Sequence, residues 1–189
     1  MTLPAKAFVA AMLASSVASA QAPEQAPPRD VGQSDPQRKA SEKAAAQAAE
    51  QAKNDIDLAD IHLQVARLYL AGLHGLGGSP SEWDREHGVA LFTLAQNALT
   101  DADRQLAELQ GLAQRNWPDA REPLAKMRTS LVRAQTQLRS LSVPMRTGGG
   151  QDQAGQSVIR GVYKSLDSSR DELESAAKKM GVDPKLKTP

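Results

Sequence analysis

Residues 45–70 read AAQAAEQAKNDIDLADIHLQVARLYL, and apolar side chains recur in them at alternating steps of four and three. Such steps place all members on one face of an α-helix and are typical of helices that pack lengthwise on one another. The stripe consists of Ala45, Ala49, Ala52, Ile56, Ala59, Leu63, Ala66 and Leu70. A second stripe is expected to widen the buried face in the C-terminal half, and it consists of Leu58, Ile61, Val65 and Leu68. The pattern predicts a long helix over about 37–73.

The same periodicity returns in three further segments, and the apolar alternation typical of strands is not found. The predicted helices cover about 80–114, 119–142 and 154–180. Their stripes are Phe92, Ala95, Leu99, Ala102, Leu106, Leu109 and Ala113; Leu124, Met127, Leu131, Ala134, Leu138 and Leu141; and Ile159, Val162, Leu166, Ser169, Leu173, Ala176 and Met180. Four amphipathic helices with short connections predict an all-α fold, an antiparallel up-down-up-down four-helix bundle over 37–181.

Capping patterns support these boundaries. Ser79 and Glu82 have the spacing of a capping box at the start of the second helix. Asp119 and Glu122 repeat that spacing at the start of the third helix. Pro144 is expected to stop the third helix, because proline has no amide hydrogen to donate.

Glycines mark the remaining boundaries. The glycines at 148–150 predict a flexible linker before the last helix. Gly181 is expected to end that helix, and residues 182–189 to form a flexible tail.

The first 20 residues have the pattern of a secretory signal peptide. Lys6 precedes the apolar run 7–14, and residues 18–20 have the small-x-small form that signal peptidase recognises. We expect cleavage after Ala20 and a periplasmic or secreted location. Residues 21–36 are rich in proline and are expected to form a disordered spacer.

Composition excludes several classes of function. The chain has no cysteine, which excludes disulfides, thiolate metal sites and cysteine nucleophiles. Its 23 basic and 22 acidic residues are balanced, and it has two residues each of Trp, Tyr and Phe. This composition does not fit a nucleic-acid surface, which needs a basic patch and stacking rings. We also expect no integral membrane segment after signal cleavage, since no later apolar run is long enough.

The unequal helix lengths predict that the first two helices extend beyond the last two at the hairpin tip, about 70–88. Either residues 142–155 fold over this tip, or the tip is an exposed apolar patch, which is a common mark of a partner site. The partner-binding residues expected there are Leu70, Leu73, Leu76 and Trp83.

The histidines suggest an alternative, a metal- or b-haem-binding bundle that uses His62 and His87. His62 falls on the apolar face one heptad from Asp55 and from Tyr69, either of which is a hydrogen-bond partner for a buried imidazole. His87 follows Asp84 by three residues, the spacing of one carboxylate–histidine pair of a di-metal bundle site.

Haem ligation would need a methionine as well, and Met127 and Met180 are the candidates. Both occupy heptad positions, where methionine usually fills the core. We therefore predict no metal and no cofactor.

A further alternative comes from residues 99–105. Leu99-Thr100-Asp101-Ala102-Asp103 resembles the Leu-Thr-x-x-Gln box of Spy-like periplasmic chaperones, with Asp103 at the position of the family's glutamine. The resemblance covers one box, and it implies an all-helical periplasmic protein that binds other proteins.

No nucleophile elbow or phosphate-binding loop is present, so the sequence gives no support for an enzyme. The pattern favours a non-enzymatic exported bundle that binds another protein or an envelope component, through the 70–88 tip or the alanine-rich first helix. A homodimer is a further expectation, because Ala45, Ala49 and Ala52 permit two helices to approach closely.

Overall fold

The computed structural model describes residues 35–76, 82–147 and 153–183. Every regular element within these ranges is a helix, which confirms the all-α fold class. The four long helices are α1 (Asp35–Gly75), α2 (Glu82–Asn116), α3 (Arg121–Ser140) and α5 (Gln153–Met180). Two short elements lie between them, the 3-10 helix η1 (Pro118–Ala120) and the helix α4 (Ser142–Thr147).

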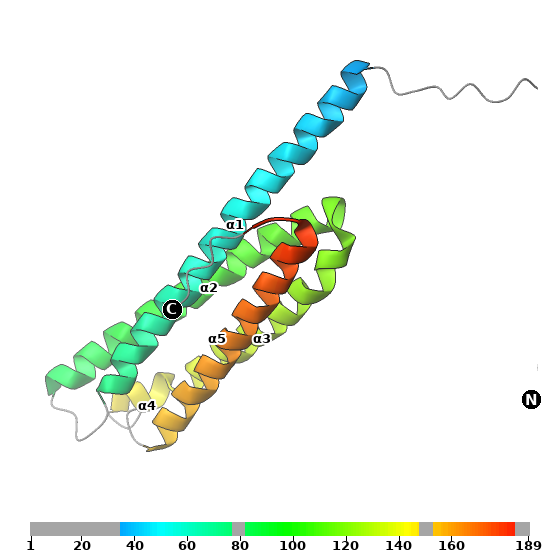
Figure 1. Ribbon diagram of the computed structural model, residues 1–189. Coiled ribbons are helices and arrows are strands. Elements are labelled where there is room, and N and C mark those ends of the chain that lie inside the picture. Colours follow the sequence, from blue (N-terminus) through cyan, green and yellow to red (C-terminus); the bar gives the residue numbers. More distant parts are fainter. Residues whose placement is uncertain (1–34, 77–81, 148–152, 184–189) are drawn as a thin grey trace, which may run out of the picture.

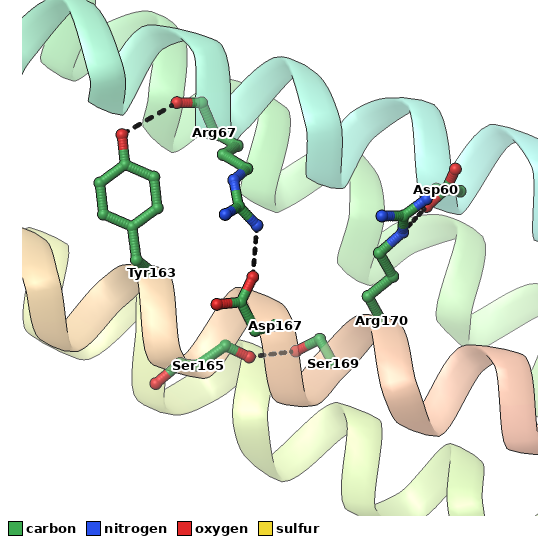
Figure 2. Close-up of polar contacts among 7 residues, drawn as sticks. All are labelled: Asp60, Arg67, Tyr163, Ser165, Asp167, Ser169 and Arg170. Atoms are coloured by element: carbon green, nitrogen blue, oxygen red, sulfur yellow. Dashed lines mark hydrogen bonds and ion pairs between the residues drawn. The ribbon is translucent and has the colours of Figure 1, made fainter. Parts of the chain in front are cut away.

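The four long helices form two antiparallel pairs that share one core. α1 packs chiefly on α2, α3 packs chiefly on α5, and the two pairs lie against each other (Figure 1). The core contains every member of the predicted stripes of α2, α3 and α5, including Ser169. Ser169 is buried without a penalty because its hydroxyl donates to the Ser165 carbonyl at 2.9 Å (Figure 2).

α3 begins differently from the prediction. The residue before its first turn is Ala120, and no side chain caps the amides there. Instead, the η1 turn is closed by the Ala120 amide, which donates to the Trp117 carbonyl at 3.0 Å. Glu122 pairs with Lys126 at 2.8 Å rather than reaching back to Asp119. The predicted Asp119–Glu122 capping box is therefore wrong.

The helix α4 was not expected. Pro144 is its third residue and lies in the first turn. Amides in the first turn have no carbonyl partner within the helix, so proline is tolerated there. The Met145 amide donates to the Leu141 carbonyl at 2.8 Å, so the chain starts a new helical turn almost where α3 stops. Met145 is buried, and α4 packs on α2.

The end of α5 follows the prediction. Gly181 has φ +67°, and its amide donates to the Lys178 carbonyl at 3.2 Å. The Val182 amide donates to the Ala177 carbonyl at 3.0 Å, which completes a Schellman motif. Val182 is itself buried, so its side chain joins the core just after the helix stops.

The bundle has its overhang at the end opposite to the predicted one. α1 is 41 residues long, and its N-terminal turns project beyond the ends of α2 and α3 (Figure 1). Residues 36–47 are all exposed, and we call them the α1 arm. At the other end, the Gln156 side chain of α5 donates to the His74 carbonyl of α1 at 3.3 Å, so the second pair of helices reaches the hairpin tip. The surplus length of α1 therefore appears at its N-terminal end.

Across the described ranges, no helix has an apolar stretch long enough to cross a membrane.

Candidate functional site

Two of the four residues expected at the hairpin tip are buried. Leu70 and Leu73 are fully buried, Leu76 is half-buried, and the Trp83 side chain lies outside the described residues. The expectation that Leu70 and Leu73 form an exposed apolar surface is therefore wrong. At this end residues 142–147 of the connection form α4, which packs on α2, and α5 reaches α1 through the Gln156–His74 hydrogen bond. Partner binding at Leu76 or Trp83 stays a prediction.

The three histidines do not come together in one site. His62 is half-buried on α1, and His74 and His87 are exposed. Asp55 Oδ2, which could accept a hydrogen bond from His62, is buried without a partner. The Asp84 side chain lies outside the described residues, so its pairing with His87 stays untested.

The described residues hold no group of three or more His, Asp or Glu side chains arranged to bind a metal ion. Met127 and Met180 lie in the core at 0% and 5% exposure. Neither methionine lines the cleft between α1 and α5, whose walls are Gln64, Arg67, Leu68, Ala71 and Tyr163. The residues of this cleft therefore do not fit a b-haem site.

The segment that resembles the chaperone box lies in the middle of α2. Leu99 is fully buried in the core, and the Thr100 hydroxyl donates to the Gln96 carbonyl at 2.9 Å. Asp101 forms an ion pair with Arg104 at 2.9 Å. Leu99 and Thr100 also line a small cleft of about 160 Å³ between α2 and α3, together with Gln135 and Arg139.

A different apolar surface is left uncovered on α1. Leu58, Ile61 and Leu68 are 42%, 51% and 71% exposed, and Val65 between them is half-buried. Their steps of three, four and three place them on one face, away from the core stripe of the same helix. We call Leu58, Ile61, Val65 and Leu68 the α1 apolar face. The sequence interpretation that this stripe widens the buried face is therefore wrong for Leu58, Ile61 and Leu68, whereas Val65 is partly buried and packs against the core.

The same surface continues onto α2. Gly72 of α1 lies so close to α2 that a Cβ atom there would be 3.2 Å from Leu91 Cδ1. One turn further along α2, Leu94 is 41% exposed. The outer side of the α1–α2 pair thus carries large apolar side chains from both helices.

A cleft adjoins the α1 apolar face on its other side. It lies between α1 and α5, has a volume of about 440 Å³, and is lined by Gln64, Arg67, Leu68, Ala71 and Tyr163. Leu68 belongs to both the cleft and the α1 apolar face. The Tyr163 hydroxyl donates to the Arg67 carbonyl at 3.3 Å, which fixes the ring as one wall (Figure 2).

The charged group in the cleft is already satisfied by its neighbours. Arg67 forms an ion pair with Asp167 of α5, and its guanidinium carbon lies 5.5 Å from the centre of the Tyr163 ring (Figure 2). Burial raises the pKa of Tyr163, and the nearby Arg67 charge partly opposes that rise. The cleft therefore offers apolar contact more than a binding site for an anion.

A second ion pair between the same helices is buried. Arg170 Nε of α5 lies 2.9 Å from Asp60 Oδ1, and the Asp60 side chain is 5% exposed (Figure 2). The other carboxylate oxygen, Asp60 Oδ2, accepts from Gln64. With both oxygens satisfied, this carboxylate holds α1 and α5 in register beside the cleft.

One buried carboxylate lacks such a partner. Asp55 on α1 is 6% exposed, and its Oδ2 atom has no hydrogen-bond partner. Burial raises the pKa of Asp55, and the negative charge of Glu108 on α2 raises it further. Asp55 and Glu108 thus place two like charges at the contact of α1 and α2.

No family model, no curated protein and no solved structure matches this chain.

Proposed function

We propose that this chain is an exported, non-enzymatic helical-bundle protein that binds another protein through the α1 apolar face. The observation that supports the proposal is the 71% exposure of Leu68 within an apolar stripe that no element of the chain covers in the described residues. Single exposed leucines are common, but several on one helix face form a continuous patch of the kind that marks a binding surface.

The arrangement suits a partner helix. The stripe presents apolar side chains at helical spacing, which is the pattern that helix-in-groove recognition uses. The adjoining cleft offers a recess beside Leu68 into which one side chain of the partner can insert. The proposed surface replaces the hairpin tip, because Leu70 and Leu73 are buried there.

The experiment places a photo-cross-linking amino acid at position 68 in the cells that make the protein, with position 132 as the control. Val132 is a 49% exposed apolar residue on α3, outside the proposed surface. We expect a cross-linked protein from position 68 that is absent from position 132 and is lost when Ile61→Glu is added. No cross-link from position 68, or equal cross-links from both positions, would contradict the proposal.

The proposed location has its own test. Cleavage after Ala20 predicts that the protein isolated from the periplasm or medium begins at Gln21. N-terminal sequencing of the isolated protein checks this, and a product that retains Met1 and stays in the cytoplasm would rule out export.

A further inference from the structure

We infer that the protein bound by the α1 apolar face is a second copy of this chain, in an antiparallel α1–α1 contact about a two-fold axis. This inference rests on the proposed function, because it names the occupant of the same surface. It is carried by the order of the exposed side chains along α1 and by their chemistry.

The stripe reads the same in both directions. Leu58, Ile61, Val65 and Leu68 are separated by steps of three, four and three, with residue 63 at the centre. In an antiparallel contact centred there, Leu58 faces Leu68 of the second copy, and Ile61 faces its Val65. A two-fold contact requires that one surface be complementary to itself, and this spacing meets that requirement.

The chemistry of the opposed positions also matches. The contact brings leucine to leucine and one β-branched residue to another, with no charge among the four positions. The polar residues that flank the centre are His62 and Gln64, so no acidic side chains meet at the axis.

The area of the face is small for a stable interface. The four side chains present on the order of 400 Å² per copy, against the ~800 Å² per partner of a standard stable interface. Leu94 adds to this on the flank. We therefore expect a weak, reversible dimer whose population depends on concentration, and not a permanent one.

The first test measures mass against concentration by sedimentation of the purified protein. We expect a rise from the monomer towards the dimer, and monomer at all concentrations for Ile61→Glu and for Leu68→Glu. The matched controls are Val132→Glu and Val143→Glu, which place the same charge at exposed apolar positions elsewhere, and we expect both to dimerise like the wild type. Far-UV circular dichroism checks that the variants keep their helices.

The second test reads the direction of the contact. The chain has no cysteine, so single cysteines can be introduced without competing thiols. We expect oxidation to cross-link a mixture of Leu58→Cys and Leu68→Cys chains, but neither variant alone. In the antiparallel contact, residue 58 of one copy lies about 15 Å along the helix from residue 58 of the other copy, and the same holds for residue 68. A parallel dimer would cross-link each variant alone and would overturn the antiparallel arrangement.

The two proposals fail separately. A wild-type protein that stays monomeric at every concentration overturns the second-copy inference. In that case, a cross-link from position 68 to a different protein still supports the proposed function. A dimer that Ile61→Glu leaves intact overturns the inference and moves the contact elsewhere on the molecule.

Discussion

At the scale of single residues, two aspartates on α1 have opposite consequences. Asp60 is buried, but its two oxygens meet Arg170 and Gln64, so its charge is compensated. Asp55 is equally withdrawn from solvent, but its Oδ2 has no partner and Glu108 adds a like charge. The first carboxylate is held by two partners, whereas burial and the Glu108 charge disfavour the ionised form of the second.

The raised pKa of Asp55 predicts how stability depends on pH. Because the folded chain binds this proton more readily than the unfolded chain, the contribution of Asp55 to stability falls as pH rises from the ordinary value of 3.8 through the raised pKa. Asp55→Asn removes that ionisation, and at pH 7 we expect a melting temperature higher by on the order of 2 °C. Thermal unfolding at pH 7 and pH 4 measures this, and the gain should shrink at pH 4. A variant that is less stable than the wild type at pH 7 contradicts the prediction.

The two ion pairs between α1 and α5 should differ in strength. Asp60→Ala removes a carboxylate that is 5% exposed, and we expect a loss of about 2–3 kcal/mol in unfolding free energy. Asp167→Ala removes one that is 52% exposed, and we expect a loss of less than about 1 kcal/mol. Urea denaturation of both variants provides the comparison, and equal losses would show that burial does not set the strength of these pairs.

At the scale of the helices, two glycines respond to alanine in opposite directions. Gly181 stops α5 with φ +67°, which disfavours a side chain by about 1–2 kcal/mol, so Gly181→Ala should destabilise the fold. Gly111 lies inside α2, and a Cβ there would have no atom within 4 Å. Gly111→Ala should therefore stabilise by up to about 1 kcal/mol. Chemical denaturation of the two variants measures the change in unfolding free energy. If both variants gained stability, the assignment of Gly181 as the helix stop would be contradicted.

The sequence predicted where the helices lie better than it predicted which of their apolar faces are buried. The stripes of α2, α3 and α5 are buried as their periodicity indicates, because each of these helices has one main apolar face. α1 carries two such faces, and periodicity alone does not say which one the bundle encloses. Leu58, Ile61 and Leu68 were therefore assigned to the core although they face outward.

The helix α4 was missed for a related reason. Pro144 indicates a stop when it is considered alone, but it also fits the first turn of a new helix. No local pattern reports where such a segment packs.

At the scale of the whole molecule, the α1 arm contributes helix but little packing. Residues 36–47 are exposed along their full length, so their removal takes no side chain from the core. A chain that starts at Ala48 should lose helical signal in circular dichroism but keep its unfolding free energy to within about 1 kcal/mol. Loss of the cooperative unfolding transition would contradict this and would show that the arm supports the bundle.

The pairing of α1 with α2 and of α3 with α5 has a consequence for the order of folding. Each pair joins neighbouring helices, so it closes short loops and can form early. The contact of Asp60 with Arg170 joins residues 110 positions apart, and the Arg67–Asp167 contact joins residues 100 apart. These bonds can form only when α5 is present, whereas the packing of α1 on α2 and of α2 on α3 does not depend on α5.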